Sequence, residues 1–267
     1  MNSTTSIAHV AAPHWTALGS EPVRAVLEYA RMRMMTRRAF PRGDGHPVII
    51  FPGLAADRHS IGPLTRFCRQ LGYAASDWGR GFNRGPQGDV DAWIDDLAQH
   101  VGDMARPHHQ TMSLIGWSLG GIYAREVAKK LSGRVRQVIT IGTPFAGTAE
   151  QTHVSWVYRL VNGQQPMLDD ALMTRLRQAP DVPTTSIFSR SDGIVAWQAC
   201  IQSGRSKRTE NLEVTGSHCG LGWNTQVLSI IADRLGLPAN QWQRHAGDVT
   251  RPHDWHNLNA LRARSTE

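Results

Sequence analysis

The chain has 267 residues, 40% of them hydrophobic, which is enough to bury the core of one large α/β domain. Its 29 lysines and arginines outnumber 22 aspartates and glutamates, for a net charge of +7. The arginines are scattered rather than collected in one run, which argues against nucleic-acid binding and favours at most a weak attraction to anionic surfaces. Three cysteines are too few for a disulfide framework and fit a reducing compartment.

No run approaches the length needed to span a bilayer, and the first twenty residues lack the pattern of a signal peptide, so we expect a cytoplasmic protein. Residues 1–20 are expected to form a loose polar arm. A helix is predicted over residues 21–38, with Val23, Val26, Leu27 and Ala30 on one side and arginines largely around the other. This is either a surface helix packed on the domain or a basic amphipathic helix that makes weak contact with a membrane surface.

From residue 47 onward, short apolar runs alternate with helical stretches, as in right-handed βαβ units. The pattern predicts an α/β fold with a mostly parallel, doubly wound sheet flanked by helices. Strands are expected at 47–51, 73–76, 112–115, 135–141, 184–189 and 211–214, and helices at 60–71, 91–104, 119–131 and 224–235.

Residues 145–182 break this rhythm with two predicted helices, 152–161 and 169–178, and no strand between them. We interpret them as a helical insertion, which either forms a lid above the strand ends or packs on the sheet. The expected organisation is an arm and helix over 1–40, an α/β domain with this insertion over 41–237, and a polar basic tail over 238–267.

A serine lies at the turn between a predicted strand and a predicted helix, in Gly116-Trp117-Ser118-Leu119-Gly120. This is the G-x-S-x-G pattern in its required context. Such a turn strains the serine backbone and leaves no room for side chains at 116 and 120. It also points the positive end of a helix at the hydroxyl. Ser118 is therefore a candidate nucleophile; the alternative is a glycine-rich turn without catalytic function.

A serine nucleophile needs a histidine base and an acid that orients it, which follow it in the chain order serine, acid, histidine. Asp192 and His218 each follow a predicted strand and fit this order, whereas Asp169, Asp170 and Asp181 lie in or beside the insertion. Activity should then rise with pH through about 6.5, where a histidine loses its proton. The backbone N–H groups of Leu54 and Leu119 are candidate oxyanion donors.

Five tryptophans are candidate walls of an apolar acyl pocket, although core packing is the better explanation for any one of them. Three lie within a few residues of the candidate catalytic residues, one lies in a glycine-rich loop and one lies in the insertion: Trp117, Trp197, Trp223, Trp78 and Trp156.

Three segments, residues 114–125, 139–147 and 191–195, resemble the α/β-hydrolase superfamily and its bacterial triacylglycerol lipase branch. The similarity covers about residues 47–235. It implies that Asp192 is the acid, and that the protein is an esterase or lipase-like serine hydrolase acting through an acyl-enzyme on a small-molecule or lipid ester, without a cofactor.

Two positions depart from that branch. The chain has Pro52-Gly53 where the lipases usually have His-Gly, and Gly220 where they place a calcium-binding aspartate. Because of Gly220 we expect no calcium site, and we expect no other metal site. The same residues would also serve an acyltransferase or a thioesterase, and a non-catalytic binding module on this fold is a further alternative.

Overall fold

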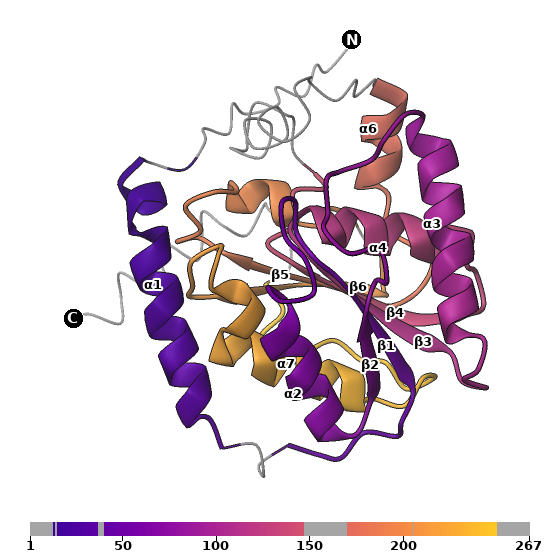
Figure 1. Ribbon diagram of the computed structural model, residues 1–267, viewed down its shortest axis with the longest axis horizontal. Coiled ribbons are helices and arrows are strands. Elements are labelled where there is room, and N and C mark those ends of the chain that lie inside the picture. The colour runs from indigo at the N-terminus through magenta and orange to yellow at the C-terminus, as the bar shows by residue number, and fades with distance from the viewer. Residues whose placement is uncertain (1–12, 14, 37–39, 147–169, 205, 250–267) are drawn as a thin grey trace.

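The computed structural model describes residues 13, 15–36, 40–146, 170–204 and 206–249. Its strands are β1 (Pro47–Phe51), β2 (Ala74–Asp77), β3 (Met112–Trp117), β4 (Val135–Ile141), β5 (Thr184–Ser189) and β6 (Thr209–Val214). They form one parallel sheet in the order β2-β1-β3-β4-β5-β6 (Figure 1). The predicted α/β class and parallel sheet are confirmed.

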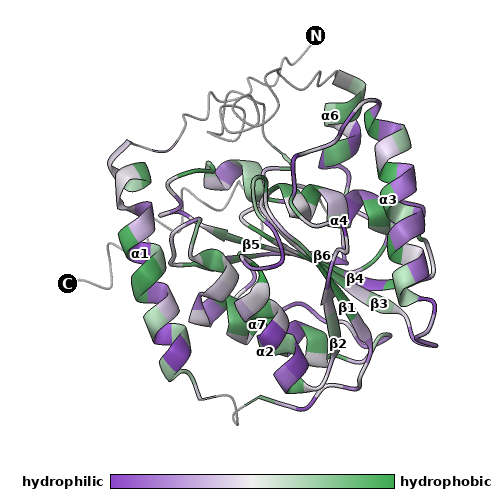
Figure 2. Ribbon diagram, in the orientation of Figure 1, coloured by the Kyte–Doolittle hydropathy of each residue, from purple (hydrophilic) through white to green (hydrophobic). Residues whose placement is uncertain are grey.

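Strands β1 and β3 follow apolar runs of the sequence because a sheet covered on both faces needs side chains that can be buried on both sides. Every residue of β1, β3 and β5 is buried, and the centre of the sheet is coloured mainly as hydrophobic in Figure 2. Strands β1, β4 and β5 have the predicted bounds. Strand β6 begins two residues earlier than predicted, since Thr209 already pairs with Thr184 of β5.

Helices cover both faces of the sheet. Helices α2 (Gly62–Leu71) and α7 (Thr225–Gly236) pack on one face. Helices α3 (Val90–Ala105) and α4 (Leu119–Lys130) pack on the other, with α6 (Asp170–Arg177) beside α4. Two side chains cap the helix starts: Asp89 accepts a hydrogen bond from Ala92 N–H in α3, and Asn224 accepts from Gln226 and Val227 N–H in α7.

The N-terminal helix α1 (Trp15–Met34) corrects two expectations. It begins at Trp15, so residues 15–20 are helical rather than part of a loose arm. Its orientation also differs from that of an ordinary surface helix, because its buried residues are Glu21, Ala25, Glu28 and Met32. The apolar side predicted to pack on the domain faces solvent instead. Its two carboxylates are turned inward because they find backbone donors there, as described below.

The two peripheral segments are described in part. Helix α6 is the second predicted helix of the insertion, while the first, over 152–161, lies outside the described residues together with Trp156. The start of the predicted tail lies against β6, where Leu212 and Asp248 form an isolated antiparallel bridge and Asp248 accepts a hydrogen bond from Asn211 N–H at 2.9 Å. This contact covers part of an edge strand.

We expect Gly120→Ala to destabilise the protein by about 2 to 3 kcal/mol, because overpacking a rigid contact carries a cost of this order. A Cβ at this position would lie 2.5 Å from the Pro52 carbonyl oxygen and 2.7 Å from the Phe51 carbonyl carbon. Urea unfolding measures the change. Gly62→Ala is the matched control, since a Cβ there meets no atom within 4 Å. Equal stability of the two variants would contradict this account of the Gly120 contact.

Candidate active site

Ser118 lies between β3 and α4 with φ 54° and ψ −125°, in a backbone region that residues other than glycine rarely adopt. Such a conformation costs about 1 to 3 kcal/mol and persists only where the surroundings enforce it. The surroundings here are tight, because a Cβ at Gly116 would overlap the backbone of Gly120 and Gly121. The two glycines of the sequence pattern therefore have the steric function that the pattern predicts.

The loop after β1 lies against Ser118. A Cβ on Gly53 would be 3.3 Å from the Ser118 Cβ and 3.9 Å from its Oγ. Leu54 follows in the same loop, and Leu119 is the first residue of α4, so the two candidate oxyanion donors lie on the segments next to the serine. Asn83 fixes this loop with two hydrogen bonds. Its side-chain amide donates to the Pro52 carbonyl at 2.9 Å, and its backbone carbonyl accepts from Ala55 N–H at 2.8 Å.

The structure brings Asp192 and His218 together in a buried pair. Their Oδ2 and Nδ1 atoms are 2.6 Å apart. The other oxygen of Asp192 accepts hydrogen bonds from Ile194 and Val195 N–H at 2.8 and 2.7 Å, which fixes the carboxylate. With Nδ1–H donated to Asp192, the imidazole is held in the tautomer whose Nε2 is free to accept a proton.

Two contacts connect this pair to the serine turn. The indole N–H of Trp117 donates to the His218 carbonyl at 3.2 Å. Ser118 N–H donates to the Ile141 carbonyl at 2.8 Å, and the next residue, Gly142, leaves so little room that a Cβ there would be 3.2 Å from His218 Nδ1. The ends of β3, β4, β5 and β6 thus bring Ser118, Asp192 and His218 to one edge of the sheet.

Electrostatics favour the protonated form of His218. Burial on its own lowers the pKa of this histidine, but the charge of Asp192, the hydrogen bond to it and the charge of Glu21 together raise the pKa above its usual value. The neighbouring thiol of Cys219 is no rival nucleophile, since burial and nearby carboxylates raise its pKa to about 12.

Sequence reasoning missed Glu21, whose carboxylate joins the two loops that carry Asp192 and His218. It is only 2% exposed. Its Oε1 accepts hydrogen bonds from Gly193 N–H at 2.8 Å and His218 N–H at 2.9 Å, and its Oε2 accepts from Cys219 N–H at 2.8 Å. Three backbone donors for one carboxylate make this a strong charge-assisted contact. One side chain of α1 therefore fixes the turns after β5 and β6 relative to each other.

Glu28 lies one turn after Ala25 on the same buried face of α1. Its Oε1 accepts hydrogen bonds from the backbone N–H and hydroxyl of Ser217 at 2.8 and 2.9 Å, and its Oε2 accepts from the side-chain amide of Asn224 at 3.0 Å. A Cβ on Gly220 would lie 2.5 Å from Oε2. The Glu28 carboxylate therefore occupies the space into which an aspartate at 220 would extend. The departure from the lipase pattern at this position has a steric reason.

The candidate pocket tryptophans lie in different places. Trp117 is buried beside His218, with ring centroids 6.2 Å apart, and it contacts Trp223, whose indole N–H donates to the Ala25 carbonyl at 2.9 Å.

Trp78 is part of the core, stacked on Tyr123 with centroids 5.8 Å apart. Trp197 stacks on Phe188 under the Arg190 guanidinium. Among these rings, Trp117 lies next to His218, and Trp223 lies next to Trp117.

No family model matches the sequence, and no curated protein matches it either. Solved structures do. Aspergillus fumigatus lipase B matches with a TM-score of 0.58 and 19% identity, over 79% of this chain and 56% of that chain. A Pyrococcus furiosus esterase matches with a TM-score of 0.54 and 16% identity, over 70% and 80%. Mouse alpha/beta hydrolase domain-containing protein 10 matches with a TM-score of 0.51 and 18% identity, over 74% and 94%.

The chain spans a little over half the length of the lipase and most of the length of the other two proteins. At these identities the likeness concerns the fold. It agrees with the parallel sheet, its strand order and the strained serine turn at the end of β3. This chain is a protein of the α/β-hydrolase fold.

Proposed function

We propose that the protein is a serine hydrolase that cleaves carboxylic esters of apolar acyl groups through an acyl-enzyme. The observation that carries this proposal is the convergence on one sheet edge of a strained, buried serine and a hydrogen-bonded histidine–aspartate pair. Backbone strain at a serine has no use in a turn that only connects a strand to a helix. The structural neighbours, which are named as lipases and esterases, support the same reaction class.

In the first half of the reaction, Ser118 Oγ attacks the ester carbonyl carbon while His218 Nε2 takes the hydroxyl proton. The tetrahedral intermediate carries its negative charge on the former carbonyl oxygen, which the N–H groups of Leu54 and Leu119 stabilise. His218 then gives the proton to the alkoxy oxygen as the carbon–oxygen bond breaks, and the alcohol leaves.

In the second half, a water molecule attacks the acyl-enzyme carbonyl and His218 takes its proton. Collapse of the second intermediate releases the carboxylic acid and returns the proton to Ser118. Asp192 orients the imidazole and stabilises its positive charge in both halves. The negative charge of Glu21, which accepts a hydrogen bond from His218 N–H, also stabilises the positive charge of the imidazole.

The proposed substrate class is a small-molecule or lipid ester with an apolar acyl group. Of the candidate tryptophans, we propose that Trp117 and Trp223 contact such a group, because Trp117 adjoins both His218 and Trp223. Indole rings suit this function since they offer a large apolar surface.

We expect Ser118→Ala to lower the turnover of p-nitrophenyl esters by at least about a thousandfold, because it removes the nucleophile and leaves only binding and oxyanion stabilisation. A fluorophosphonate should label the wild type at Ser118 alone, as located by peptide mass spectrometry. Ser229→Ala on α7 is the control, with unchanged rates and labelling. Equal turnover by Ser118→Ala and the wild type, with both folded, would refute the proposal.

The pH dependence should report the charge of Glu21. His218 must be neutral to act as a base, and its pKa is raised, so kcat/KM of the wild type should reach half its maximum above pH 6.5. Glu21→Gln removes one of the negative charges that raise this pKa, so the midpoint should move to lower pH. Rates measured across a pH series on one soluble ester give the midpoint.

Glu28→Gln is the matched control for this experiment. It changes the same functional group on the same helix, but Glu28 is not among the groups that shift the pKa of His218. We expect its pH midpoint to equal that of the wild type, even where the substitution lowers stability. A similar shift in both variants would show that loss of packing, rather than the charge of Glu21, moves the midpoint.

A further inference from the structure

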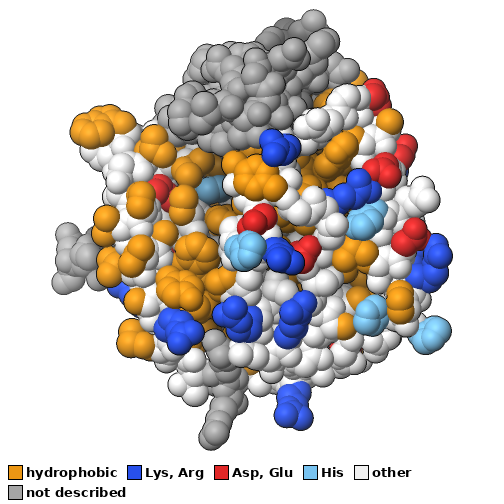
Figure 3. Space-filling model, viewed as in Figure 1, with side chains coloured by type: hydrophobic (Ala, Val, Ile, Leu, Met, Phe, Trp, Pro, Cys, Tyr) orange, Lys and Arg blue, Asp and Glu red, His pale blue; other side chains and the backbone are white. Residues whose placement is uncertain are grey.

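Helix α1 presents an apolar stripe to solvent. Val23, Leu27, Ala30 and Met34 recur at the spacing of one helix face, opposite the buried Glu21, Ala25, Glu28 and Met32. These residues are largely exposed: Val23 is 65%, Leu27 54% and Met34 77% exposed. Trp15, at the start of the helix, is exposed as well. Figure 3 shows hydrophobic side chains gathered over this part of the molecule, at the left of the view.

The exposed charged side chains of α1 have one sign. The acidic residues of α1 are Glu21 and Glu28, and both carboxylates are turned into the protein. Arg31 and Arg33, in the last turns of the helix, are exposed. The outer side of α1 is therefore apolar and basic, without a carboxylate.

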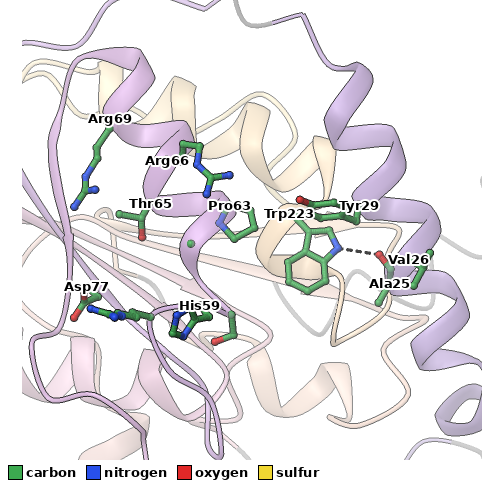
Figure 4. A pocket seen from close by; sticks show the side chains of 13 residues that line it. Ala25, Val26, Tyr29, His59, Pro63, Thr65, Arg66, Arg69, Asp77 and Trp223 are labelled. Atoms are coloured by element: carbon green, nitrogen blue, oxygen red, sulfur yellow. Dashed lines mark hydrogen bonds between the residues drawn. The ribbon is translucent and has the colours of Figure 1, made fainter.

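A cavity of about 870 Å³ lies along one side of α1 and continues this surface. Val26 and Tyr29 of α1 form one wall with Trp223, and the opposite wall comes from α2 and the loop before it, including Arg58 and Arg66 (Figure 4). Asp77 also lines the cavity, but its carboxylate accepts a hydrogen bond from Gly79 N–H. Among the residues that the structure describes, neither Arg58 nor Arg66 pairs with a carboxylate.

We propose that this surface, the outer side of α1 with the arginine-bearing wall of the cavity, docks the protein onto an anionic lipid membrane. The apolar stripe and Trp15 enter the interfacial region, and the guanidinium groups of Arg31, Arg33, Arg58 and Arg66 contact lipid phosphates. Within the described residues no helix is long and apolar enough to cross a membrane. In this proposal the contact runs along the length of α1.

The charge pattern selects this occupant over a second copy of the chain. Two copies joined through their α1 stripes would bring like-charged arginines together, with no carboxylate on the outer side of either helix to offset them. An anionic lipid surface offers opposite charge and an apolar layer together. The inference concerns binding alone and does not depend on the proposed ester hydrolysis.

The test is cosedimentation of the full chain with vesicles of phosphatidylcholine alone and of phosphatidylcholine mixed with phosphatidylglycerol. We expect binding to the mixed vesicles that weakens with salt. The double variant Val23→Ser with Leu27→Ser should bind at least tenfold more weakly, because it removes apolar burial. Arg58→Gln with Arg66→Gln should bind about tenfold more weakly to mixed vesicles, since each surface cation contributes a severalfold effect.

Two controls keep the result specific. Val23→Ile with Leu27→Met retains apolar side chains and should bind like the wild type. Arg106→Gln removes an exposed arginine at the end of α3 and should also leave binding unchanged. Thermal unfolding of each variant shows that it is folded.

Three results would overturn the proposal: no sedimentation of the wild type with mixed vesicles, equal binding to both vesicle types, or binding that the two double variants leave unchanged. A wild-type dimer in sedimentation velocity that Val23→Ser with Leu27→Ser dissociates would assign the stripe to a second copy instead.

Discussion

Two buried carboxylates on one helix set the arrangement on which the site depends. A carboxylate can be removed from water only where several donors replace its hydration. Glu21 and Glu28 meet this requirement by accepting hydrogen bonds from the loops after β5 and β6. Because their hydrogen-bond donors lie on those loops, the helix has one orientation that satisfies both charges. In that orientation one side of α1 holds the loop that carries His218, and the apolar stripe on the other side is exposed to solvent.

The same contacts shape the electrostatics around His218. Burial disfavours the imidazolium, and two carboxylates compensate: Asp192 through a direct hydrogen bond, and Glu21 through its charge close to the histidine backbone. An imidazolium forms in each half of an acyl-enzyme reaction, so compensation of its charge favours the transition state. This compensation also raises the pKa of His218, which moves the pH range in which the histidine can act as a base toward alkaline values.

The strained serine turn depends on the sheet in a similar way. Ser118 keeps a positive φ because β3, the loop after β1 and the start of α4 approach so closely that only glycines fit at 116 and 120. The strain is therefore maintained by backbone packing, and Asn83 extends this packing by holding the loop that contains Gly53 and Leu54. Pro52 in place of histidine does not alter this arrangement, because its carbonyl serves as the acceptor.

The sequence by itself determined the features that arise from local patterns. Short runs rich in apolar and β-branched residues located β1, β4 and β5, since such residues favour strands buried on both faces, and glycine spacing located the turn at Ser118. The tertiary structure decided which way α1 faces, because the donors that satisfy Glu21 lie 172 to 198 residues away. It also decided that Trp78 belongs to the core, because its stacking partner Tyr123 comes from another element. Helical periodicity records that two faces differ; which of them is buried depends on partners that only the folded chain supplies.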